Sequence, residues 1–269
     1  MRILSFDIGG TKIAWALVNE NGEIVSEINK EKTPETANEI ARLLKKAAAA
    51  QTIEGVSVAT AGVVYNNLLQ GKPNNLPIGY DKINFAQIFN VPFIIENDAV
   101  SALWAEYKIG ALYGCKNGIM LTLGTDVGCS ILCNGQVVRG KTGAAGEYQF
   151  DFSGRSLQKL AQEYNLAEND CFLIYKLVQQ GNKKATKVYK IWEERMLAAM
   201  QMLNQLLDTE IFALSGSLSE IVDYAKVNKA LKLLEPHNPP IIKKAQCGVN
   251  AGIIGAGLLW IVQTRGITK

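Results

Sequence analysis

The sequence predicts an α/β protein built from two similar domains. Residues 3–22 and 119–135 share one pattern, in which a strand, a Gly-Thr turn and a second strand are followed by an Asn-Gly turn. Apolar strands and helical patterns are mixed along the rest of the chain, as is typical of α/β folds. The chain has 269 residues, more than most single cores need. We therefore expect two related domains that face each other.

Periodicity and turn residues predict the elements in order. Strands and a hairpin are expected up to residue 29, and a helix over 34–51, where Ile40, Leu44 and Ala48 recur at helical spacing. An apolar strand at 53–61 leads into 62–92, an irregular stretch whose length usually signals function. Further along we expect a strand at 93–96, a helix from Asn97-Asp98, a hairpin at 119–138, helices near 156–164, 170–180 and 186–207, a strand at 210–214, a helix start at the next Ser-Gly-Ser, and a last helix at about 249–263.

Composition excludes several classes of protein. The net charge of +3 does not indicate a nucleic-acid binder, and no apolar run reaches the ~18 residues of a membrane span. The first strand begins at residue 2 and the five cysteines form no CxxC pair, so we expect a cytoplasmic protein without a signal peptide. The one histidine, His237, excludes a multi-histidine metal site and leaves general-base work to other side chains.

The first Gly-Thr turn carries the strongest chemical signal. Asp7 ends a strand and is followed by Gly9, Gly10, Thr11 and Lys12. Glycines allow close backbone approach and positive φ, and consecutive N–H groups form an anion site. A carboxylate can hold Mg²⁺ or its waters. The segment therefore fits a cradle for a metal-bound polyphosphate, although Gly-Gly is also common in ordinary hairpins.

Asp98 is the candidate general base. It follows the apolar strand at 93–95 and opens a helix, so it lies where ligands collect in open α/β sheets. The alternative is that Asp98, or Asn97 before it, only caps the helix. The pattern alone does not separate these two roles.

Six motifs in the same order resemble the ROK sugar kinases of the actin and hexokinase superfamily. Residues 7–12 and 123–128 resemble the family's first and second phosphate motifs. Residues 95–99 resemble the segment that carries the family's catalytic aspartate. Residues 143–147 resemble the start of the family's sugar-contact signature, and residues 212–219 resemble its adenosine-side strand and glycine turn. Residues 252–257 resemble its last helix. The resemblance covers nearly the whole chain.

The resemblance implies a ribonuclease-H-like fold with the active site in the interdomain cleft. The domains would be 1–108 and 109–255, with a C-terminal helix at about 256–269 packing back onto the first. The chain would phosphorylate a hexose or N-acyl hexosamine with ATP and Mg²⁺, and Asp98 would be the base. The implied ATP residues are Asp7, which also holds Mg²⁺ through water, with Gly9, Gly10, Thr11, Lys12, Gly124, Thr125 and Gly216. The implied sugar residues are Gly62, Asn75 (or Asn74), Asn97, Asp98 and Glu147.

The chain also departs from the family pattern. Glu147 is followed by Tyr148-Gln-Phe150, where the family has Ile-Gly-His and a cysteine-rich zinc loop, so we expect no structural zinc. Asp126 replaces a glycine in the second phosphate motif, and a carboxylate beside a triphosphate is unfavourable unless Mg²⁺ intervenes. The alternative is therefore a catalytically weak relative that senses nucleotide or sugar. We expect a homodimer whose partner is a small sugar, with no nucleic acid or membrane partner.

Overall fold

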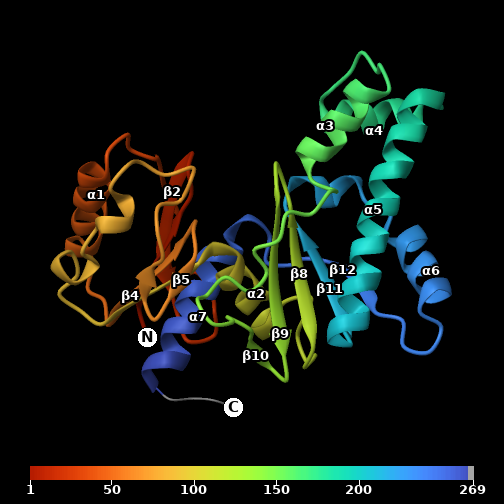
Figure 1. Cartoon of the computed structure of the whole chain (residues 1–269). Coiled ribbons are helices and arrows are strands. Elements are labelled where there is room, and N and C mark those ends of the chain that lie inside the picture. The colour runs from red at the N-terminus through yellow and green to blue at the C-terminus, as the bar shows by residue number, and fades with distance from the viewer. Residues whose placement is uncertain (266–269) are drawn as a thin grey trace. The chain divides into compact units, whose positions relative to one another are not determined.

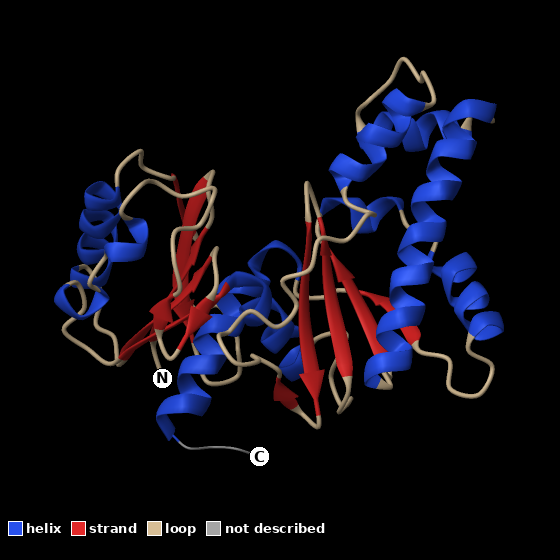
Figure 2. Ribbon diagram, viewed as in Figure 1, coloured by secondary structure: helices blue, strands red, loops and turns tan. Residues whose placement is uncertain are grey.

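The computed structural model describes residues 1–265, and the chain divides by its contacts into two compact units (Figure 1). The first unit comprises Met1–Tyr113, Val137–Ala145 and the chain from Cys247 onward, and the second comprises Gly114–Gln136 and Gly146–Gln246. Each unit holds a five-stranded sheet with helices, which confirms the predicted α/β class (Figure 2). The domain boundaries taken from the sequence stay predictions. The end of the predicted C-terminal helix, 266–269, lies outside the described residues.

The sheet of the first unit has the order β3-β2-β1-β4-β7. Its first three strands are antiparallel, whereas β1, β4 and β7 are parallel. Two short strands, β5 (Val64–Tyr65) and β6 (Leu68–Leu69), form a separate hairpin. The five strands of the sheet are β1 (Ile3–Ile8), β2 (Lys12–Val18), β3 (Asn29–Lys32), β4 (Gly55–Thr60) and β7 (Phe93–Asn97).

Helices cover both faces of this sheet because its central strands are apolar on both sides. On one face, Ile40 and Leu44 of α1 (Ala37–Ala49) share a buried cluster with Phe6 of β1. The other face packs against α7 (Ala251–Arg265), which also lies along α2 (Asp98–Ile109). Within the stretch 62–92, the 3-10 turns η1 (Tyr80–Lys82) and η2 (Phe85–Gln87) add Tyr80 and Phe85 to the first cluster.

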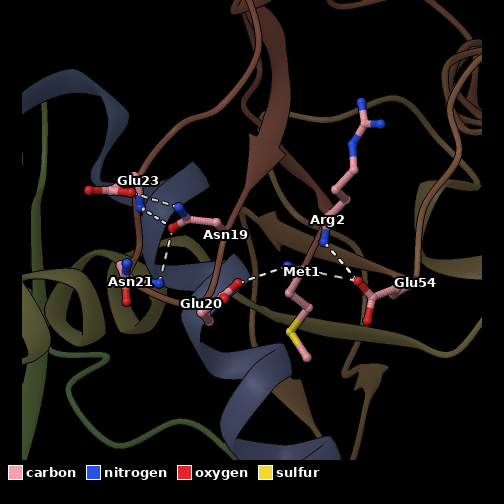
Figure 3. Close-up of polar contacts among 7 residues, drawn as sticks. All are labelled: Met1, Arg2, Asn19, Glu20, Asn21, Glu23 and Glu54. Carbon is pink, nitrogen blue, oxygen red and sulfur yellow. Dashed lines mark hydrogen bonds and ion pairs between the residues drawn. The ribbon is translucent and has the colours of Figure 1, made fainter.

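The amino end of β1 is held by polar contacts (Figure 3). The amino group of Met1 lies 2.9 Å from a carboxylate oxygen of Glu20, and the Arg2 N–H donates to Glu54 Oε1 at 3.2 Å. After β2, Asn19 Oδ1 accepts the N–H groups of Asn21 and Glu23 at 3.0 and 2.9 Å, which closes the predicted turn. These contacts fix the end of the strand opposite Asp7.

The sheet of the second unit repeats this topology, with the order β10-β9-β8-β11-β12. β8 and β9 are antiparallel, and β8, β11 and β12 are parallel. The internal repeat predicted from the two Gly-Thr hairpins is therefore confirmed as a repeat of sheet topology. The strands are β8 (Gly118–Leu123), β9 (Val127–Cys133), β10 (Gln136–Val137), β11 (Ile211–Ser215) and β12 (Ile241–Lys244).

Helices of the second unit bury the face of β8 that carries Ile119, Leu121 and Leu123 (Figure 1). They are α3 (Gly154–Glu163), α4 (Cys171–Gln179), α5 (Lys183–Leu207) and α6 (Tyr224–Leu234). A helix does start at the expected Ser-Gly-Ser, but it is a 3-10 helix and not the next α-helix. A 3-10 turn, η3 (Ser217–Ile221), follows Gly216, and α6 begins later because Asp223 supplies its N-cap. Among the helices of residues 1–265, none has the length and apolarity that a membrane crossing requires.

Candidate active site at the strand ends

Three parallel strands of the first unit end at the same edge of the sheet. Ile8 pairs with Thr60, and Thr60 pairs with Asn97. Gly9-Gly10 therefore leaves β1 at the edge where Gly62 follows β4 and Asp98 follows β7. Carboxyl ends of parallel strands are where open α/β sheets bind ligands.

The hairpin after β1 is stabilised from within and by Thr33. The Gly9 N–H donates to the Lys12 carbonyl at 3.0 Å, and Thr33 Oγ1 donates to the Gly9 carbonyl at 2.6 Å. Neither Gly9 nor Gly10 has positive φ, so that part of the reasoning for the glycines was wrong. Gly10 is required by close approach instead, because a Cβ there would lie 2.5 Å from the carbonyl oxygen of Asn75. The predicted phosphate hairpin and the predicted sugar residue Asn75 are therefore in contact.

Asp7 lies on the face of β1 that packs against the start of α7. Burial raises the pKa of its carboxyl group, and the charge of Lys12 opposes that rise. A Cβ at Gly252 would lie 3.0 Å from Asp7 Cγ, so only glycine leaves the carboxylate its full space. Within residues 1–264, no hydrogen bond or ion pair to this carboxylate is found. A partly buried carboxylate in that state fits a hard cation or its bound waters.

The side chain of Asn97 caps α2, which separates the two roles that the sequence left open for Asp98. Asn97 Oδ1 accepts the Val100 N–H at 3.1 Å, and its Nδ2 donates to the Gly62 carbonyl at 2.9 Å. Asp98 is the first residue of the helix, and its Oδ1 accepts the N–H of the adjacent Ala99 at 2.9 Å. Gly62 has φ +99° and lies against Pro73, so Asn97 and the predicted pocket floor form one structure.

A buried pair of hydroxyl groups lies near Asp98 and was not predicted from the sequence. The Tyr80 hydroxyl and Thr60 Oγ1 are 2.8 Å apart and share a hydrogen bond. Burial raises the pKa of Tyr80, and the charge of Asp98 raises it further, whereas the bond to Thr60 lowers it. Tyr80 is therefore a neutral group within electrostatic reach of Asp98. Its only sequence signal was its position in the long irregular stretch.

The second hairpin is joined to the start of α3. The Gly154 N–H donates to the Gly124 carbonyl at 2.9 Å, and the Arg155 N–H donates to the Thr125 carbonyl at 3.2 Å. The Arg155 guanidinium lies 3.1 Å from Asp126 Oδ1. The carboxylate that replaces the family's glycine therefore has a cation beside it. Arg155 was missed because 29 residues separate it from Asp126.

Gly216 and Gly124 follow two paired strands at one edge of the second sheet. Thr122 pairs with Ser215, and a Cβ at Gly216 would lie 2.3 Å from the Leu123 carbonyl oxygen. With φ +79°, Gly216 also has a backbone conformation that other residues rarely adopt. The predicted adenosine turn and the second phosphate hairpin are thus adjacent.

Glu147 is exposed and follows a tight glycine. Gly146 has φ +93°, and a Cβ there would lie 2.1 Å from the Cys129 carbonyl oxygen. Burial and then the charge of Glu147 raise the pKa of the Cys129 thiol to about 12. Glu147 is therefore close to β9 of the second unit, and the proposed sugar residues Gly62, Asn75, Asn97 and Asp98 belong to the first.

The described residues contain no group of three or more histidine, cysteine, aspartate and glutamate side chains that could hold a metal ion. The expected absence of structural zinc stays a prediction. All five cysteines are free thiols, of which Cys133 is exposed.

Comparisons with known proteins agree along almost the whole chain. The model described as "ROK family" matches residues 3–149 and 151–263. The chain is 24% identical over 288 residues to an N-acetylmannosamine kinase of Salmonella typhi, covering 96% of this chain and 98% of that protein. It is 28% identical over 305 residues to a glucokinase of Streptomyces coelicolor, covering 94% and 95%. A ROK family glucokinase from Streptomyces griseus, solved with glucose and AMPPNP, superposes with a TM-score of 0.76 at 25% identity, covering 96% of this chain and 99% of that one. The chain belongs to the ROK family.

Proposed function

We propose that this chain is an ATP-dependent sugar kinase that phosphorylates a hydroxyl of a hexose or an N-acyl hexosamine. The observation that carries the proposal is the shared edge of β1, β4 and β7, where the glycine hairpin, Gly62 and Asp98 follow three paired strands. Its relatives that are named glucokinase and N-acetylmannosamine kinase support the same reaction and both classes of acceptor.

Asp98 is the general base in this proposal. Its carboxylate takes the proton of the acceptor hydroxyl as that oxygen forms a bond to the γ-phosphorus, the bond to the β–γ bridging oxygen breaks, and ADP leaves. Asn97 is already oriented by the Val100 N–H and the Gly62 carbonyl, so its remaining amide hydrogen can hold a sugar hydroxyl beside Asp98. Asn75 and Glu147 supply further sugar contacts, and Gly62 shapes the pocket floor.

The two glycine hairpins bind the triphosphate in this proposal. Gly9, Gly10, Thr11 and Lys12 act from the first unit, and Gly124 and Thr125 act from the second, where Gly216 lies against the adenosine. When bound, Mg²⁺ neutralises phosphate charge during transfer. The partly buried carboxylate of Asp7, which has no hydrogen bond or ion pair within residues 1–264, is the group that fits it, through water. The location of the site in an interdomain cleft stays a prediction from the sequence.

The alternative is a sensor with weak catalysis, and the unbalanced charge of Asp126 was one reason for it. The ion pair with Arg155 weakens that reason, because the nearby cation offsets the repulsion between this carboxylate and phosphate. We also propose that the protein is a cytoplasmic homodimer without a membrane or nucleic-acid partner. Light scattering of the purified protein measures the oligomeric state.

A coupled assay of ADP release tests the function with glucose, mannose, N-acetylmannosamine and N-acetylglucosamine. We expect one of these to be phosphorylated with Mg²⁺-ATP, and Asp98→Asn to remove most of the turnover. Binding of sugar and AMPPNP without measurable transfer, in both wild type and variant, would instead establish the sensor.

A further inference from the structure

The strand that carries the proposed base contains a buried charge. Glu96 is the residue before Asn97 in β7, and its side chain is only 5% exposed. Arg139 donates to Glu96 Oε2 through Nη2 at 2.5 Å and through Nε at 3.1 Å. The other oxygen, Oε1, accepts the Asn97 N–H at 2.9 Å. One carboxylate therefore links an arginine to the backbone of the residue that precedes Asp98.

Arg139 belongs to a short segment that returns to the first unit from the second. This segment, Val137–Ala145, is closed by a bond from the Ala145 N–H to the Arg139 carbonyl at 3.3 Å. At Gly143, φ is +85° and a Cβ would lie 2.3 Å from the Val64 carbonyl oxygen, so the segment packs tightly against β5. Glu147 follows two residues after Ala145, so the path of the segment sets where the chain toward Glu147 leaves the first unit.

We propose that Arg139 and Glu96 are positioning residues that set the strand end of Asn97 and Asp98 and anchor the chain leading to Glu147. The inference rests on the proposed function. This pair differs from a surface ion pair because Glu96 is buried. Removing the partner of a buried carboxylate leaves an uncompensated charge, which is strongly destabilising. Nε and Nη2 of Arg139 both donate to Glu96 Oε2, and this two-donor contact fixes direction as well as charge, which lysine cannot reproduce.

The pair also governs the electrostatics of the base. Glu96 and Asp98 are two residues apart, so their α-carbons are separated by at most about 7 Å. Other titratable groups on elements packed near Asp98 include Tyr80, Asp81 and Lys82 of η1 and Tyr65 of β5. β4 contains none, and the described side chains of α7 contain none.

Removing one partner therefore has an effect whose sign is fixed. Arg139→Gln leaves the charge of Glu96 unbalanced, which raises the pKa of Asp98 and moves the acid limb of kcat/KM to higher pH. Glu96→Gln leaves the arginine cation unbalanced and moves that limb to lower pH. We expect shifts of at least about 0.5 pH unit in opposite directions, and near cancellation in the double variant.

The experiment measures kcat, the KM for sugar and the pH profile of wild type, both single variants and the double variant. We expect Arg139→Gln to lower kcat/KM by roughly 10–100-fold, because small misplacements of reacting groups have effects of this size. The sugar KM stays raised in the double variant, since charge balance is restored but the anchor is not. The control is Arg195→Gln, which breaks the ion pair of Arg195 with Asp151 in the second unit. It should change neither the sugar KM nor the pH profile.

Arg139→Lys serves if Arg139→Gln does not fold. This variant keeps the positive charge and loses the two-donor contact with Glu96. The acid limb of kcat/KM should therefore stay at the wild-type pH while the sugar KM rises. The inference is overturned if the pair's variants match wild type in sugar KM and acid limb while Asp98→Asn is inactive. If Asp98→Asn keeps wild-type turnover, the proposed role of Asp98 fails, and the inference that rests on it fails with it.

Discussion

Replacing Asp98 and Asn97 separately distinguishes a general base from a helix cap. In the structure the cap belongs to Asn97, whose side chain bonds both Val100 and Gly62, whereas Asp98 accepts the N–H of its neighbour Ala99. Asp98→Asn keeps an oxygen in the same place and leaves the cap intact. Asn97→Ala removes the cap and the bond to Gly62 together. The two substitutions should therefore affect different properties.

The sizes of the two effects follow from these contacts. Loss of an N-cap costs about 0.5–2 kcal/mol, and a further hydrogen bond costs about 0.5–1.5 kcal/mol. At about 2–4 °C per kcal/mol for domains of this size, Asn97→Ala should lower Tm by roughly 2–14 °C. Asp98→Asn should change Tm by less than about 2 °C. Loss of a general base should lower kcat by about 10²–10⁴-fold, which is roughly 3–5 kcal/mol of transition-state stabilisation.

Thermal unfolding of both variants and a coupled ADP assay on the sugar found active give the two quantities. A matched control is Glu163→Gln, which neutralises an exposed acid in α3 of the second unit and should alter neither. The reasoning is refuted if Asp98→Asn is as destabilised as Asn97→Ala and keeps near-normal kcat, since Asp98 would then have a structural role only.

Three further outcomes are expected. Gly10→Ala should raise the KM for ATP and lower Tm, because its Cβ would lie 2.5 Å from the Asn75 carbonyl oxygen. Gly9→Ala is the control, since its Cβ would make only an ordinary contact at 3.5 Å. Equal effects of both substitutions would show that the Asn75 contact is unimportant. Arg155→Gln should raise the KM for ATP several-fold and leave Tm within about 1 °C, because exposed ion pairs contribute little stability, and Asp126→Gly in the same background should restore the KM if charge repulsion is the cause. At pH 8 iodoacetamide should modify the exposed Cys133 first. The pKa of Cys129 is raised to about 12 by burial and by Glu147, so only about 10⁻⁴ of its thiol should be ionised at that pH. Mass spectrometry that finds Cys129 modified as fast as Cys133 in the folded protein would contradict this structure.

The sequence by itself determined the fold class and the chain positions of the glycine hairpins. Both follow from local patterns, since period-two apolar runs and Gly-Thr turns specify a strand–turn–strand wherever they occur. The repeated pattern also predicted the repeated topology of the two sheets. It did not predict the 3-10 turn after Gly216, because a glycine turn before a helical pattern does not say which later residue supplies the cap.

Only the tertiary structure decided which side chains contact one another within each unit. The pairs Tyr80 with Thr60, Arg155 with Asp126 and Arg139 with Glu96 join residues that are 20, 29 and 43 positions apart. The cap of α2 was assigned to Asn97 by side-chain direction, which residue type alone leaves open. Gly10 is needed for the approach of Asn75 and not for its own φ. Local patterns encode backbone conformation, whereas packing over long chain separations places these charges and hydroxyl groups beside one another.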